Sequence, residues 1–146
     1  MKIYTSYWAQ VKNFPPHLVG LNTTIWPPRW RELGKDKRGV WVLDCPPVKP
    51  GKQCEGLCNG KCEPRHPNTC TFLEVYYLQL NRINFTDFMK HLQDLHDKIC
   101  AGESLNDIDF AFIFFEAPAN KCSERGPFQA WFAHNDMPIS EWKPNI

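Results

Sequence analysis

The sequence predicts a single small three-layer α/β domain over residues 1–146, built on a mainly parallel sheet. Three observations lead to this prediction. The apolar run Phe110–Phe115 is typical of a strand covered on both faces, apolar residues recur at helical spacing through Phe85–Ile99, and short strand-like segments precede both. Strands separated by helices favour a parallel sheet with helices on its faces, and antiparallel pairing of the first strands stays open.

The length and the charge of the chain limit what it can be. Its 146 residues, 42% of them hydrophobic, suffice for one core and are too few for two ordinary domains. The net charge of +1 excludes a broad positive field that would attract nucleic acid or anionic membranes without sequence preference, although a local basic patch is compatible with it. The first residues lack the apolar segment of a signal peptide, and no apolar run reaches the roughly 20 residues that span a bilayer. We therefore expect a cytoplasmic protein with no membrane partner, in a compartment where disulfides are rare.

Short strands are expected in the first half of the chain, where proline pairs follow the apolar runs. Met1–Tyr7 and Leu18–Thr24 are brief, rich in aliphatic or β-branched residues, and end at polar or proline residues. Gly39–Leu43 has a weaker pattern of the same kind. These segments predict two strands and a third, less marked one.

Helices are expected in the second half. Asn84 is the predicted N-cap of the Phe85–Ile99 helix, and Gly102 lies just beyond its expected end. Phe128–Ala133 is the last predicted helix. Thr71–Leu80 fits a helix by the spacing of its apolar residues and a strand by its β-branched and aromatic content, so the pattern leaves both open.

A cysteine-rich loop insertion at residues 45–70 is predicted to hold a structural zinc ion. Four cysteines and one histidine fall within residues 54–70, which contain almost no apolar side chains that could order the segment by burial. A tetrahedral zinc ion held by thiolates would supply the missing folding free energy. The expected ligands are Cys54, Cys58, Cys62 and Cys70, with His66 or Cys45 as substitutes.

Other interpretations of this loop remain open. The spacing Cys-x3-Cys-x3-Cys-x7-Cys differs from the paired two-residue knuckles of common zinc ribbons. Its first three cysteines are similarly spaced to the iron–sulfur motif of radical enzymes that use S-adenosylmethionine, but the final gap is one residue too long and the chain too short for their barrel. In an oxidising environment, disulfides would staple the loop and leave one of the seven cysteines unpaired.

A second candidate site follows the predicted strand Phe110–Phe115. In open α/β sheets, ligands bind outside the carboxyl ends of the strands, and here Glu116, Cys122 and Arg125 come next. Arg125 near a helix N-terminus suits a phosphate or a carboxylate, and nearby cations favour a nucleophilic thiolate at Cys122. The alternative is structural, with Glu116 and Arg125 as an ordinary ion pair and Cys122 as a small buried side chain.

An aromatic and basic stretch lies at residues 26–31. Tryptophans beside arginines, here Trp26 and Trp30 with Arg29, stack on bases and contact phosphates. The alternative is that the tryptophans pack against the sheet while the charges are solvated.

Two segments resemble a known family. The stretch FIFFEAPANKCSERGPFQAWF is similar to the signature of the domain of unknown function 488 family of bacteria and phages, in which an apolar strand leads into Glu-x-Pro and Cys-His-Arg-His before a helix ending in Trp. The opening KIYTSYWAQVKNFP, with Trp26–Trp30, resembles the N-terminal pattern of its phage-type members. The resemblance covers most of the chain except residues 40–70, approximately.

The resemblance implies an α/β fold, a polar site of Glu116, Cys122 and Arg125, and a helix at Thr71–Leu80. It implies no activity. This chain also departs from the pattern, because Ser123-Glu124 stands where the family has histidine, one residue is inserted, and Gly126 replaces the second histidine. If those histidines act as acid or base in the family, this chain is catalytically impaired.

Two classes of function are compatible with these features. In the first, the protein is phage-related and binds or processes a nucleotide or nucleic-acid-derived ligand at the carboxyl edge of the sheet. In the second, it is a non-enzymatic phage-type interaction protein that binds and inhibits a host defence protein. A pocket around Glu116 would favour the first, and an exposed apolar patch the second. The ligand-binding residues expected in the first case, besides Glu116, Cys122 and Arg125, are Tyr4, Ser6, Trp26 and Arg29.

Overall fold

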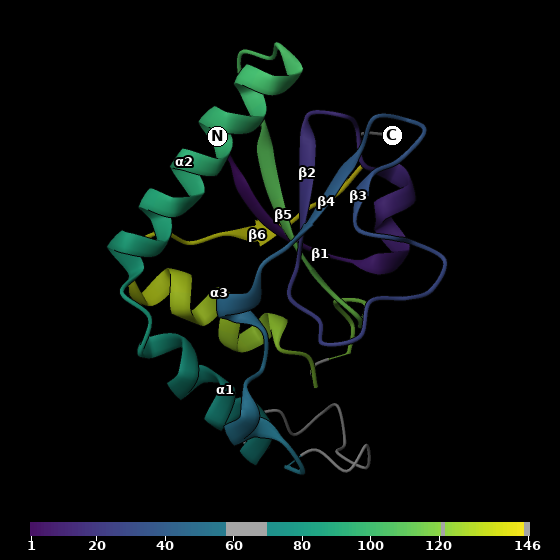
Figure 1. Cartoon of the computed structure of the whole chain (residues 1–146). Helices are drawn as coiled ribbons and strands as arrows, with labels where there is room; N and C mark the ends of the chain where they lie inside the picture. The colour runs from purple at the N-terminus through teal and green to yellow at the C-terminus, as the bar shows by residue number, and fades with distance from the viewer. Residues whose placement is uncertain (58–69, 121, 145–146) are drawn as a thin grey trace.

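A computed structural model describes residues 1–57, 70–120 and 122–144 of the chain. Within them, six strands form one sheet in the order β3-β4-β2-β5-β1-β6 (Figure 1). Only β3 and β4 pair antiparallel, and the other neighbouring strands of this sheet pair parallel. The predicted α/β fold with a mainly parallel sheet is confirmed. The strands are β1 (Ile3–Tyr7), β2 (Leu18–Asn22), β3 (Gly34–Lys35), β4 (Trp41–Asp44), β5 (Asp109–Phe114) and β6 (Ser140–Glu141).

The helices agree with the sequence prediction and extend it. The segment for which helix and strand were both open is helical. None of the helices in the described ranges combines the length and the apolar character needed to cross a bilayer. The α-helices are α1 (Thr71–Asn81), α2 (Phe85–Glu103) and α3 (Arg125–His134), and the 3-10 helices are η1 (Trp8–Asn13), η2 (Pro46–Val48) and η3 (Lys52–Cys54).

Helix α2 begins as predicted and ends later than predicted. The Asn84 side chain accepts a hydrogen bond from the backbone N–H of Asp87 at 3.0 Å, which satisfies one of the free donors of the first turn. Gly102 does not end the helix. Instead Ser104, with a φ of 54°, adopts the left-handed conformation at the C-cap, and its N–H donates to the carbonyl of Cys100.

Strand β5 is an interior strand buried on both faces. It lies between β2 and β1, and all of its residues from Phe110 to Phe114 are buried. Phe110, Phe112 and Phe114 contact one hydrophobic cluster, while Ala111 and Ile113 contact a second cluster on the opposite face. This alternation is the reason that the segment appears as an unbroken apolar run in the sequence.

The two faces of the sheet are covered unequally. The three α-helices share one face, where aromatic side chains of α2 and α3 meet β5 and the rings of Phe112 and Phe128 lie 4.6 Å apart (Figure 1). The opposite face is covered by η1 through Trp8, Val11 and Phe14. Among the described residues, the third layer of the predicted three-layer domain is therefore the 3-10 helix η1. The link between β1 and β2 is short, and Pro15, which follows Phe14 directly, stops the helix from continuing.

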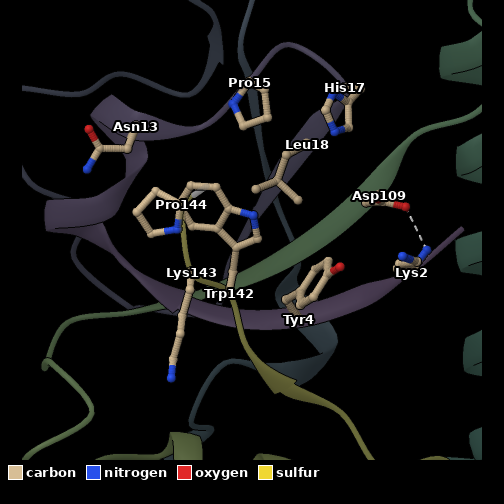
Figure 2. Close-up of a pocket in the computed structure, with 10 residues that line it drawn as sticks. All are labelled: Lys2, Tyr4, Asn13, Pro15, His17, Leu18, Asp109, Trp142, Lys143 and Pro144. Carbon is tan, nitrogen blue, oxygen red and sulfur yellow. Dashed lines mark hydrogen bonds between the residues drawn. The ribbon is translucent and has the colours of Figure 1, made fainter. Parts of the chain in front are cut away.

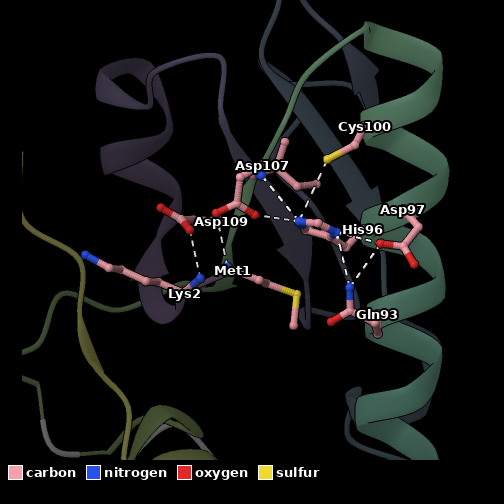
Figure 3. Close-up of polar contacts among 9 residues, drawn as sticks. Met1, Lys2, Gln93, His96, Asp97, Cys100, Asp107 and Asp109 are labelled. Atoms are coloured by element: carbon pink, nitrogen blue, oxygen red, sulfur yellow. Dashed lines mark hydrogen bonds and ion pairs between the residues drawn. The ribbon is translucent and has the colours of Figure 1, made fainter.

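A polar cluster ties α2 to the loop before β5 (Figure 3). His96 Nδ1 lies 2.9 Å from Asp97 Oδ1, and His96 Nε2 lies 2.6 Å from Asp107 Oδ1. Hydrogen bonds to Asp97 and then Asp107 raise the pKa of His96, and the same contacts lower the pKa of each aspartate. The N-terminal ammonium group lies 3.1 Å from Asp107 Oδ2. The cluster fixes the amino edge of the sheet, opposite the edge described next.

Candidate functional site at the carboxyl edge of the sheet

Arg125, the first residue of α3, is a buried cation held by the carboxyl edge of the sheet. Its side chain is only 7% exposed. Its Nε donates to Glu141 Oε1 at 2.7 Å, and its Nη2 donates to the carbonyl oxygens of Glu116 at 2.7 Å and Ser6 at 3.3 Å. One side chain thus joins the ends of β1 and β5 to β6 and α3.

The partner of Arg125 is also bound on its other side. Glu141 Oε1 accepts a hydrogen bond from Thr5 Oγ1 at 2.7 Å, and Thr5 Oγ1 in turn accepts one from Gln129 at the same distance. The guanidinium carbon lies 5.7 Å from the ring centroids of both Tyr7 and Phe114. These contacts occupy the cation within the chain, so Arg125 acts here as a structural anchor of the edge.

The carboxyl groups of Glu116 and Glu124 interact electrostatically near this anchor. Burial and then the nearby Glu116 charge raise the pKa of Glu124 to about 7, and Arg125 offsets this rise only partly. The Oε2 atom of Glu116 is buried and has no hydrogen-bond partner among the described residues. With a pKa of about 7, Glu124 can exchange a proton near neutral pH. The neighbouring charge of Glu116 belongs to a carboxyl group whose buried oxygen accepts no hydrogen bond from the described residues.

Glu124 lines a pocket of about 150 Å³ that opens between the ends of β2 and β5. Trp26 is 79% exposed and Phe115 is 47% exposed, so aromatic side chains at this pocket face solvent. The pocket thus combines a titrating carboxyl group with an exposed indole. Its lining residues are Thr23, Thr24, Ile25, Trp26, Pro50, Phe115 and Glu124.

Internal hydrogen bonds fix the threonine wall of this pocket. Thr23 Oγ1 donates to the carbonyl of Ile113 at 2.7 Å, and Thr24 Oγ1 donates to Asn22 Oδ1 at 2.5 Å. The indole N–H of Trp8 donates to Thr24 Oγ1 at 3.3 Å. Because these hydroxyl groups are already engaged, Glu124 is the polar side chain of the lining that is most able to take part in new hydrogen bonds.

The structure gathers some of the predicted site residues and separates others. Glu116 and Arg125 meet at the carboxyl edge, but through the main-chain carbonyl of Glu116 and not as an ion pair. Trp26 lies at the neighbouring pocket, while Tyr4 lines a different pocket near the amino ends of the strands. Ser6 ends in a buried Oγ with no hydrogen-bond partner among the described residues.

Two further predicted residues lie outside the Glu124 pocket lining. Arg29 is exposed, three residues beyond Trp26. Cys122 is half-buried after Asn120, whose Oδ1 accepts the backbone N–H of Cys122 at 3.0 Å.

Sequence reasoning missed Glu124 as a site residue and Glu141 as the partner of Arg125. The sequence prediction treats Glu124 only as a departure from the family pattern, although its position next to Arg125 is a signal. Glu141 gives no such signal, because it lies in a two-residue strand, 16 positions after Arg125.

The predicted zinc loop lies mostly outside the described residues. Cys58, Cys62 and His66 fall in residues 58–69, so the structure describes Cys54 and Cys70 alone among the four expected ligands. In the described ranges, no three His, Cys, Asp or Glu side chains come together in a way that could hold a metal ion. The zinc site stays a prediction.

Two of the described cysteines near this loop are buried, whereas Cys70 is half-buried. Cys54 is buried, with its Sγ 3.8 Å from Gln79 Oε1, and burial raises its pKa. Cys45 is also buried, and burial raises its pKa to about 12, which holds it as a neutral thiol. To replace a zinc ligand, Cys45 would have to lose its proton, because the thiolate is the metal-binding form.

The carboxyl edge thus defines the protein as an α/β domain with a small acidic, aromatic pocket at the ends of its parallel strands. Comparison of the chain with family models, curated proteins and solved structures gives no match. Its resemblance to the domain of unknown function 488 family therefore stays a prediction, and its function is argued from its own residues.

Replacing the buried cation should destabilise the fold strongly. We expect Arg125→Met to lower the free energy of unfolding by about 3–5 kcal/mol, because it leaves the Glu141 carboxylate largely buried without its partner. Urea denaturation measures the change. As a control, Lys35→Met removes the more exposed pair of Lys35 with Glu103 and should cost no more than about 1 kcal/mol. Equal losses in the two variants would show that Arg125 is not the anchor.

Proposed function

We propose that the protein binds a nucleotide or a nucleic-acid-derived ligand at the carboxyl edge of the sheet, with the base at the pocket of Trp26 and Glu124. The observation that carries this proposal is the exposed Trp26 indole at the same pocket as a carboxyl group with a pKa of about 7. Indole rings stack on bases of any sequence. Carboxylates accept hydrogen bonds from the amino groups of bases.

The size and charge of the pocket indicate how such a ligand would lie. A volume of about 150 Å³ accommodates part of a base but not a whole nucleotide, so the sugar and phosphate would extend outside. The carboxyl group of Glu124 in the lining disfavours a phosphate inside the pocket. Arg29, which is exposed on the same segment as Trp26, is the cation that this proposal assigns to the phosphate. Arg125 is not assigned to it, since its contacts lie within the chain.

The same pocket also bears on catalysis. A proton donor or acceptor works best when its pKa lies near the working pH, and Glu124 meets this condition. If the protein processes its ligand, Glu124 is the group we assign to proton transfer, with Glu116 raising its pKa. Cys122 stays the proposed nucleophile from the sequence, and binding alone needs neither step.

A second candidate function is supported by the exposed apolar side chains around this pocket. Exposed apolar residues that gather in one patch mark protein interaction sites, so a phage-type protein could bind and inhibit a host protein through them. Ile25, Trp26 and Phe115 line one pocket. The exposed apolar residues in these segments, with their exposed fractions, are Ile25 (48%), Trp26 (79%), Trp30 (64%), Leu33 (43%) and Phe115 (47%).

Stacking on Trp26 predicts a specific loss on mutation. Trp26→Ala should weaken the binding of an amino-bearing nucleoside monophosphate such as AMP or CMP by about tenfold or more, since base stacking on an aromatic side chain contributes about 1–3 kcal/mol. Thermal shift and calorimetry measure the affinity. Trp30→Ala is the matched control, because Trp30 is exposed on the same segment but does not line the pocket.

The outcome separates the two candidates. Absence of binding by every nucleotide in a panel contradicts the first function, and so does an equal loss in both variants. If no nucleotide binds and Trp26→Ala abolishes association with a purified host defence protein, the second function is supported.

We also propose that Cys54, Cys58, Cys62 and Cys70 hold a structural zinc ion in a cytoplasmic protein. Elemental mass spectrometry should find about one zinc per chain in the purified protein, with all seven cysteines titrating as thiols after denaturation. Cys58→Ser should lower metal content and thermal stability together, whereas Cys100→Ser, in the buried part of α2, should leave metal content unchanged. Absence of metal with fewer than seven thiols would instead indicate disulfides and contradict both zinc and the cytoplasmic location.

A further inference from the structure

A larger pocket lies on the other face of the sheet, the face that η1 covers (Figure 2). Its volume is about 450 Å³, within the roughly 300–1,000 Å³ range of small-molecule sites. Tyr4 of β1 and Leu18 of β2 line it, near the amino ends of these two strands. It is therefore separate from the carboxyl-edge pocket, and the proposed function does not use it.

The charged groups of this pocket are mostly cationic. Lys2 and Lys143 line it beside the imidazole ring of His17, and Asp109 is the one carboxylate of the lining. Asp109 Oδ1 accepts the backbone N–H of Lys2 at 2.7 Å, so part of its hydrogen-bonding capacity is already used (Figure 2). In the described parts of the chain, the two lysine ammonium groups and the His17 ring have no hydrogen-bond or ion-pair partner. The lining therefore places two lysine ammonium groups against one carboxylate.

An aromatic wall stands beside these cations. Tyr4 and Trp142 both line the pocket (Figure 2), and both pack against the hydrophobic cluster on this face of the sheet. Trp142 is fixed in place, because its ring packs edge-on against Phe14 with the centroids 5.1 Å apart and its backbone N–H donates to the carbonyl of Thr5 at 2.8 Å. A ring surface held in this way can take up a planar ligand without further ordering of the protein.

We propose that this pocket binds a small aromatic anion, a planar ring that carries a phosphate or a carboxylate. The ring lies against Tyr4 and Trp142, and the anionic group lies toward Lys2 and His17. Figure 2 places these two side chains on one side of the pocket, with Lys143 on the other. The two lysines distinguish this site from the carboxyl-edge pocket, where Glu124 is the charged residue of the lining and would repel the same anionic group.

Phenyl phosphate is the probe we would use, in an NMR titration of the isotope-labelled protein followed at the Trp142 indole N–H signal. We expect saturable shifts of this signal, with binding weakened about fivefold in Lys2→Gln through loss of one charged contact near the surface. His17→Gln is a second variant that should weaken binding in the same direction. Lys90→Gln, an exposed lysine of α2 outside the pocket, is the matched control and should bind like the original protein.

Further arms separate the parts of the proposal. Benzoate tests the carboxylate form, and inorganic phosphate and phenol test the anion and the ring alone, each of which should bind more weakly than phenyl phosphate. Trp26→Ala should leave the titration unchanged, so failure of the carboxyl-edge function would not affect this result. The proposal is overturned if the Trp142 signal does not saturate, if Lys2→Gln and His17→Gln bind like Lys90→Gln, or if phenol binds as well as phenyl phosphate.

Discussion

The buried contact between Arg125 and Glu141 is the interaction on which the carboxyl edge of this protein depends. Removing a guanidinium group from water costs several kcal/mol unless acceptors surround it, and here they come from β1, β6 and the residue after β5. Strand β6 pairs with β1 over only two positions, so this side-chain contact supplies much of what holds it in place. The sequence predicts Arg125 as a ligand-binding group, but its contacts stabilise the edge of the sheet instead.

This constraint decides which groups remain for function. With Arg125 engaged, Glu124 is the charged residue that lines the pocket beside the exposed Trp26, and the charge of Glu116 raises its pKa. The pocket on the opposite face instead has two lysines against one carboxylate, together with the aromatic side chains of Tyr4 and Trp142. The pocket on the opposite face lies beside η1, which is the shorter cover of the sheet, whereas three α-helices pack on the other face.

The sequence predicts those elements whose burial pattern is local. Strand β5 is an unbroken apolar run, and α2 shows both its periodicity and its Asn84 cap. The two-residue strands β3 and β6 escape prediction because so few residues carry no periodicity. For the site, the rule that ligands bind at carboxyl ends of strands correctly locates Glu116 and Arg125 at one edge. It cannot identify Glu141 as the partner, nor the raised pKa of Glu124, because both depend on burial by segments distant in sequence.

The most direct test of this account is the titration of Glu124 itself, followed by carbon-detected NMR of its side-chain carboxyl group. The account predicts a pKa of about 7 for Glu124, and a lower pKa in the Glu116→Gln variant, where the neighbouring negative charge is gone. A pKa near the ordinary value of 4.5 in the unmodified protein would contradict it, since Glu124 would then behave as a solvated carboxylate that neither burial nor Glu116 affects.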